Sequence, residues 1–132
     1  MVVVNDKHLV LEYDERLNCI FQIWKGFFSS ELFREGVEKT NALFAQKKPV
    51  PNFLVDISES SVIKKEDTEW AATTAIPLAI QNGLKNYGFV LPKNIFTQVS
   101  LNNFRNDLNQ PSLSIRLFDN LDRAKEWVQE GE

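Results

Sequence analysis

Two runs near the N-terminus, over residues 8–14 and 17–25, have a strand-like pattern of apolar and polar residues. A period of two is typical of β-strands, and the short Asp14-Glu15-Arg16 connection predicts an antiparallel hairpin. Apolar residues fall on both faces of the second run, with Leu17, Cys19, Phe21 and Ile23 on one and Ile20 and Trp24 on the other. We therefore expect both faces of this strand to be covered.

The rest of the chain alternates segments of helical spacing with short apolar runs. The predicted helices cover Ser29 or Ser30 to about Gln46, Glu66 to Leu84, Asn94 to about Leu108, and the segment after the Asp119-Asn120 cap. The predicted strands cover 52–57, 87–91 and 113–118. Residues 1–132 then form one α/β domain of ββαβαβαβα order. We expect a five-stranded mixed sheet in the order 1-2-3-4-5, with the last four strands parallel, packed with four helices.

Charge and composition exclude several classes of function. The net charge of −3 and the absence of any Lys/Arg run longer than two residues argue against nucleic-acid binding and against a polybasic membrane surface. No apolar run reaches 18 residues, so we expect no stable membrane insertion and a cytoplasmic location. Cys19 is the only cysteine and His8 the only histidine. We predict a buried Cys19 and neither a metal site nor a cofactor.

Four polar residues follow or end the predicted parallel strands, where α/β sheets usually place ligands. They are Lys25, Asp56, Ser58 and Asp119. Asp56 is the best candidate for a functional carboxylate, although such residues commonly accept hydrogen bonds from their own loop or pair with a lysine such as Lys25. The Ser58–Ser61 loop offers hydroxyl groups, but a nucleophilic serine needs a base and His8 is the only histidine. We therefore predict a polar loop with no catalytic residues.

The segment from Trp70 to Ile80 is unusually apolar for a helix on a protein surface. Three interpretations remain open for it: a core helix, a homodimer face or the wall of an apolar pocket. Pro77 predicts a kink. The small residues leave room for either a partner or a ligand, and they are Ala71, Ala72, Ala75 and Ala79.

An ordered set of short motifs resembles the uncharacterised bacterial proteins grouped as SpoIIAA-like, or STAS-like. The motifs are Trp24-Lys25-Gly26-Phe27, Phe53-Leu-Val-Asp56, Glu69-Trp70, the 84–92 segment with Phe96, and the 116–127 segment. The resemblance spans roughly residues 8–128. It implies a fold shared with STAS regulators and with the CRAL-TRIO lipid-transfer domains, but fold alone does not give function.

The STAS phosphorylation motif is incomplete in this chain. Asp56-Ile57-Ser58 matches its first part, but Lys64 and Lys65 stand where the motif has Asp and the acceptor Ser. An insertion would bring Thr68 to that position, yet Glu69-Trp70 follows instead of Ser-Gly. The neighbouring acidic side chains would also repel a phosphate on Thr68. The phosphoserine switch is therefore not predicted.

The resemblance and the apolar segment together favour a non-catalytic STAS-like interaction domain that forms a homodimer and binds a protein partner. Its surface would be formed or flanked by Trp24, Phe27, Trp70, Ile76, Leu78 and Ile80. The alternative is a binding module for a small apolar or lipid-like ligand. The third hypothesis is a hydrolase that uses Asp56 and the Ser58–Ser61 loop.

Overall fold

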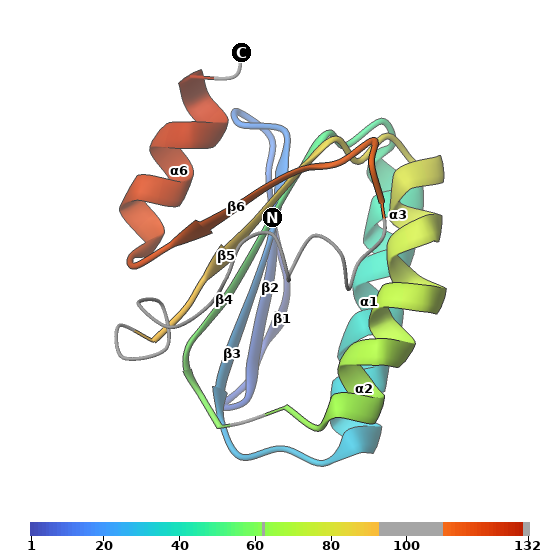
Figure 1. Cartoon of the computed structure of the whole chain (residues 1–132), viewed down its shortest axis with the longest axis vertical. Coiled ribbons are helices and arrows are strands. Elements are labelled where there is room, and N and C mark those ends of the chain that lie inside the picture. Colours follow the sequence, from blue (N-terminus) through green and yellow to red (C-terminus); the bar gives the residue numbers. More distant parts are fainter. Residues whose placement is uncertain (62, 93–109, 131–132) are drawn as a thin grey trace.

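A six-stranded mixed sheet forms the centre of the protein in the computed structural model, which describes residues 1–61, 63–92 and 110–130 (Figure 1). Its strands lie in sequence order and are β1 (Val2–Asn5), β2 (Leu9–Asp14), β3 (Cys19–Gly26), β4 (Asn52–Ser60), β5 (Asn86–Val90) and β6 (Ser114–Phe118). Strand β2 pairs antiparallel with β1 and with β3, whereas the neighbouring strands from β3 to β6 pair in parallel. The predicted hairpin, the parallel strands and their order are confirmed.

The prediction of five strands was wrong, because β1 adds a sixth at the sheet edge. The segment has only four residues and its valines do not alternate with polar residues, so the period-two pattern did not reveal it, although valine itself favours strands. A turn brings β1 against β2, with Val4 opposite Leu11. The Asp6 carboxylate closes this turn by accepting hydrogen bonds from the backbone N–H groups of His8 and Leu9, each at 2.8 Å.

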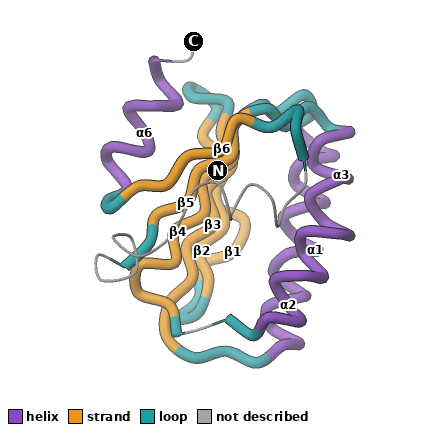
Figure 2. Tube along the Cα trace, viewed as in Figure 1, coloured by secondary structure: helices purple, strands orange, loops and turns teal. Residues whose placement is uncertain are grey.

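Helices cover both faces of the sheet (Figures 1 and 2). One face carries α1 (Ser30–Lys47) and a second helix made of α2 (Lys65–Trp70), η1 (Ala71–Ala75) and α3 (Ile76–Gln81), and the other carries α6 (Leu121–Glu130). Ser29 caps α1 and Asn120 caps α6, as predicted. The predicted helix over 94–108 lies outside the described residues. No helix in the described part of the chain has the length and hydrophobicity to cross a membrane.

The two faces of β3 belong to two separate hydrophobic clusters, which confirms that both are covered. Ile20 and Trp24 pack in the larger cluster, beneath α1 and α3. Leu17, Cys19 and Phe21 pack in the smaller cluster, beneath α6. The division follows from the alternation of side chains along a strand.

The second helix contains a π-helical turn just before Pro77, the residue at which the sequence predicted a kink. Residues Ala71–Ala75 form this turn, and the Ile76 N–H donates to the Ala71 carbonyl five residues earlier. Pro77 has no N–H, and its ring would clash with the carbonyl four residues before it in a regular α-helix. A π-helical turn avoids that clash by widening the helix next to the proline. The helix ends at Gln81, and Gly83 adopts the positive φ of 106° that suits the residue after a helix.

Strand β4 continues through Ser60, so the prediction of a polar loop beginning at residue 58 was wrong. Its last residues pair with the end of β3, where Lys25 lies opposite Glu59 and Gly26 opposite Ser60. The Ser61 N–H extends this pairing by donating to the Gly26 carbonyl at 3.0 Å. Backbone pairing thus outweighs the low strand preference of a serine-rich sequence.

Candidate functional site

An apolar cavity of about 180 Å³ lies between the sheet and the two helices on its larger cluster. Its floor comes from alternate residues of three parallel strands, namely Gln22 and Trp24 of β3, Phe53, Val55 and Ile57 of β4, and Tyr87, Phe89 and Leu91 of β5 and its end. Its roof comes from α1 and from the second helix, with Ile63 at the side. Aromatic rings supply much of the wall.

Small side chains on the second helix leave the space. Ala71, Ala72, Ala75 and Ala79 all line the cavity. Ala71 or Ala72, Ala75 and Ala79 follow one another at the spacing of three or four residues that keeps side chains on one helix face. Ala75 and Ala79 are almost completely buried, with 4% and 1% of their surfaces exposed. A methyl group at these positions does not reach the sheet as a longer side chain would. The cavity thus follows from the alanine spacing that the sequence shows.

A short hydrogen-bond chain of buried polar groups runs along one wall. The Gln22 amide Nε2 donates to the Thr40 hydroxyl at 2.8 Å, and the Thr40 hydroxyl donates to the Gly36 carbonyl at 2.8 Å. The Trp24 indole N–H donates to the Gln22 amide oxygen, also at 2.8 Å. Gln22 and Thr40 are 5% and 2% exposed. These hydrogen bonds satisfy polar groups that would otherwise be costly to bury.

The cavity wall is electrically neutral over the described residues, because no Asp, Glu, Lys, Arg or His is among them. Burial raises the pKa of Tyr87, so its phenol stays protonated at physiological pH. A charged ligand group would therefore lose its hydration without gaining a counter-charge. The site suits an uncharged, largely apolar molecule.

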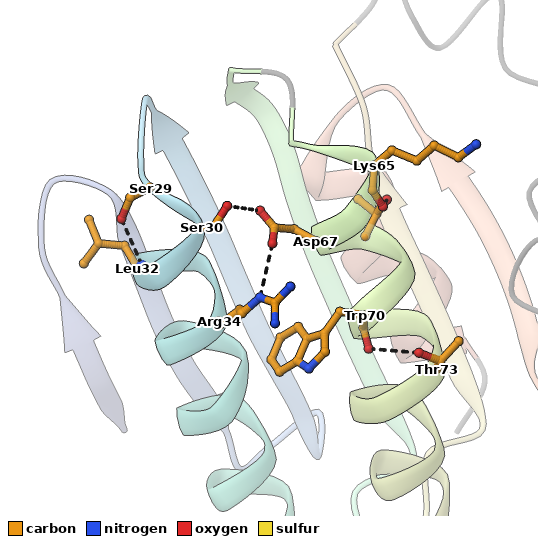
Figure 3. Close-up of polar contacts among 9 residues, drawn as sticks. Ser29, Ser30, Leu32, Arg34, Lys65, Asp67, Trp70 and Thr73 are labelled. Atoms are coloured by element: carbon orange, nitrogen blue, oxygen red, sulfur yellow. Dashed lines mark hydrogen bonds and ion pairs between the residues drawn. The ribbon is translucent and has the colours of Figure 1, made fainter.

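A polar cluster joins the two roof helices beside the cavity (Figure 3). The Asp67 carboxylate, on α2, accepts a hydrogen bond from the Ser30 hydroxyl at 2.7 Å and one from the Arg34 guanidinium at 3.2 Å, both on α1. The Arg34 guanidinium also lies 4.8 Å from the centre of the Trp70 ring. Thr68, the residue after Asp67, lines the cavity. The cluster therefore fixes the distance between the helices at one end of the roof.

A second, more polar hollow of about 360 Å³ lies between the loop after β3 and the start of α2. Phe27, Phe28, Ile63 and Lys64 contribute to its wall together with serines of the adjoining segments. Phe27 is 85% exposed at its rim. Phe28 instead packs on Trp24, with ring centres 4.7 Å apart.

The six residues proposed from the sequence as a partner surface or pocket do not share one environment. Trp24 and Ile76 are buried and line the cavity. Trp70 and Ile80 are half-buried and pack against the larger cluster. Phe27 and Leu78 are exposed, at 85% and 45%. Two of the six therefore line the cavity, two pack beside it and two lie at the surface.

The four polar residues at the strand ends are not joined into one site within the described residues. The Asp56 carboxylate accepts from the Ser58 backbone N–H at 2.9 Å and from the Ser58 hydroxyl at 2.6 Å, which is the local bonding considered as the alternative to function. Asp119 pairs with Arg123 at 3.9 Å. Lys25 lies opposite Glu59 in the sheet register.

The placement of Asp56 and Ser58 also separates them from the cavity. Phe53, Val55 and Ile57 of β4 line the cavity, and alternation along the strand turns Asp56 and Ser58 to the opposite face. His8 precedes β2, and β3 lies between β2 and β4. Two strand spacings amount to about 10 Å, too far for His8 and Ser58 to share a hydrogen bond.

Sequence reasoning missed Gln22 and Thr40 as parts of the site. The signal was present, because Gln22 lies between Ile20 and Trp24 on the same strand face and must therefore enter the core. Thr40 likewise falls on the buried face of α1 with Phe33, Val37 and Phe44. A polar residue at such a position indicates a buried hydrogen bond.

Comparison with protein-family models and with curated sequences gives no relative to guide the interpretation of this site. No protein-family model matches the chain, and its sequence matches no curated protein. Among the described residues, no group of three or more His, Cys, Asp or Glu side chains is arranged to hold a metal ion. The interpretation therefore depends on the cavity itself.

Proposed function

We propose that the protein is a non-catalytic binding module for a small, uncharged, apolar ligand. The observation that carries this proposal is the 180 Å³ cavity between the sheet and the second helix. An engineered apolar cavity of about 150 Å³ accommodates benzene, so this one suits about one six-membered ring with a small substituent. That volume is well below the roughly 300 Å³ at which drug-sized pockets begin.

The roof of the cavity supports the same proposal. Its π-helical turn at Ala71–Ala75 faces the cavity, and such turns are frequent at functional sites. Widening of the helix and the short alanine side chains both increase the space beneath it. An ordinary core would gain stability by filling that space, because each empty methyl-sized void costs roughly 1 kcal/mol.

Binding of toluene provides the test. Toluene should shift the NMR signals of cavity residues such as Ala75 and Val55, and the midpoint of thermal unfolding should rise as the toluene concentration increases. Signals of the opposite face, such as Cys19, should stay unchanged. Native mass spectrometry of the freshly purified protein should also detect a bound small molecule that denaturation releases. Absence of toluene binding would refute the proposal.

The fold supports the proposed kinship with SpoIIAA-like and STAS-like proteins without identifying an activity. The supporting feature is the antiparallel start followed by parallel strands in sequence order from β3 to β6. Kinship with the CRAL-TRIO lipid-transfer domains would agree with a ligand-binding role. Likeness of fold remains an analogy, and the cavity carries the functional proposal.

Protein interaction, with self-association into a homodimer, is the second candidate. Phe27 favours it, since an aromatic ring that is 85% exposed beside a hollow is a typical anchor for a partner. Leu78, exposed on α3, is the corresponding candidate for the dimer face. Sedimentation of the wild-type protein and of Leu78→Asp and Phe27→Ser would test this. A monomer in all three cases would exclude the homodimer.

A further inference from the structure

Gln22 keeps unused hydrogen-bonding capacity at the wall of the cavity. Its side chain is 5% exposed and forms part of the cavity wall. The amide donates once, to Thr40, and accepts once, from Trp24. A primary amide has two N–H donors and two acceptor lone pairs, so one of each remains. Within the described residues, the amide nitrogen and the amide oxygen each make one hydrogen bond to a protein group, and neither atom is left without a partner.

The neighbours fix which end of the amide points where. The Trp24 indole nitrogen can only donate, so the atom facing it must be the amide oxygen. The Thr40 hydroxyl gives its proton to the Gly36 carbonyl, so its oxygen must accept from the amide nitrogen. A rotated amide would bring donor against donor at Trp24. The chain therefore holds Gln22 in one orientation beside the cavity.

We propose that the ligand is a ring-sized alcohol of the phenol type, whose hydroxyl group hydrogen-bonds to the Gln22 amide. This inference rests on the proposed function and adds the chemical class of the ligand. A hydroxyl both donates and accepts, which matches the remaining capacity of the amide. A hydrocarbon would leave the second N–H and the second lone pair of the amide unused, and a carboxylate or amine would meet no counter-charge among the described residues of the wall.

Aromatic walls support a flat ring rather than a flexible chain. Phe53 stacks on Tyr87 with ring centres 5.2 Å apart and planes within 6° of parallel, and Tyr87 contacts Phe89 at 4.4 Å. All three line the cavity together with Trp24 and Phe33. Offset stacking and edge contacts with such rings favour an aromatic ligand over an aliphatic one of equal size.

The test compares phenol and toluene, which differ by a hydroxyl in place of a methyl group, in the wild-type protein and in Gln22→Met. Methionine has a similar length but no amide, and toluene reports whether the cavity stays intact. Gln22→Met should weaken phenol binding about five- to tenfold more than toluene binding, since the variant removes one hydrogen bond to the hydroxyl. Comparing the two ligands cancels the effect of the variant on Trp24 and Thr40.

A measurement on the wild-type protein keeps the proposal testable if Gln22→Met does not fold. The side-chain amide ¹⁵N signal of Gln22 should shift with phenol but not with toluene. Suppose that both ligands bind, that the Gln22 amide signal does not shift, and that Gln22→Met weakens the binding of both equally. The phenol proposal is then overturned, while the proposed binding function stands. If neither ligand binds, the proposed function itself fails.

Discussion

Arg34 and Asp67 form an ion pair that links α1 to the second helix, with the guanidinium Nε 3.2 Å from the carboxylate oxygen. The two partners differ in burial, because the Arg34 side chain is 43% exposed and that of Asp67 only 5%. Ser30 adds a second hydrogen bond to the same carboxylate. The ion pair therefore connects the two roof helices through the buried Asp67 carboxylate and the half-exposed Arg34 guanidinium.

Removal of Arg34 should cost more stability than removal of Asp67. Arg34→Met leaves the Asp67 carboxylate, which is 5% exposed, without its counter-charge, and we expect the free energy of unfolding to fall by about 1–3 kcal/mol. Asp67→Ala removes the buried charge itself, and water can hydrate the half-exposed Arg34 instead, so this variant should cost about 0.5–1 kcal/mol. Urea denaturation of both variants measures the difference. Equal losses would contradict the role assigned to the buried carboxylate.

Gly36 is predicted to be necessary for packing rather than for backbone conformation. A Cβ at this position would lie 2.6 Å from the Trp24 ring and 2.7 Å from Leu9. Gly36→Ala gains roughly 1 kcal/mol of helix propensity but forces the ring to move, which typically costs about 1–3 kcal/mol. We expect a net loss of stability in thermal unfolding. Glu38→Ala, on the exposed side of α1, is the control and should change stability little.

The Cys19 thiol should be unreactive in the folded protein. It is fully buried in the smaller cluster, and this burial, reinforced by Asp14, raises its pKa. The thiol therefore stays protonated and inaccessible at neutral and mildly alkaline pH. A chromogenic disulfide reagent should release its product only after guanidinium unfolds the protein. Rapid reaction under native conditions would show that the α6 face opens readily.

The Asp6 turn should give a small pH dependence of stability at acidic pH. The backbone N–H groups of His8 and then Leu9 lower the pKa of Asp6 below its ordinary 3.8. Because the folded protein prefers the charged carboxylate, this contribution is complete above the ordinary pKa and is lost as the pH falls through the lowered pKa. Asp6→Asn should be less stable than wild type at neutral pH. The difference should narrow on acidification, and a constant difference would contradict the assignment.

Much of the sheet could be predicted because periodicity reports burial directly. The two-sided apolar pattern of β3 correctly placed Trp24 and Cys19 on opposite faces. Strand β1 was missed, because its four residues are too few for a period-two pattern and its place in the sheet depends on pairing with β2. The end of β4 was missed for the same reason, because its serines are held by the backbone of β3.

The candidate site was predicted in part. Apolar character and alanine spacing indicated that the segment from Trp70 to Ile80 faces a core, a partner or a pocket, but sequence alone gives no volume. Whether space remains beneath Ala75 depends on residues of β4 and β5 across the sheet, whose distance from the helix is a tertiary property. The connection between Gln22 and Thr40 spans 18 residues and likewise depends on the packing of α1 against β3.

Filling the cavity tests the central claim most directly. Ala75→Met places a flexible apolar side chain beneath the helix, whereas Thr74→Met puts the same side chain at the neighbouring exposed position as a matched control. Toluene affinity, measured by NMR titration of the three proteins, should be retained in wild type and Thr74→Met and lost in Ala75→Met. We also expect Ala75→Met to unfold at a higher temperature than the wild type. Its free energy of unfolding should rise by the roughly 1 kcal/mol typical of cavity filling. Toluene affinity that is unchanged in Ala75→Met, or absent from the wild type, would contradict a ligand-binding cavity.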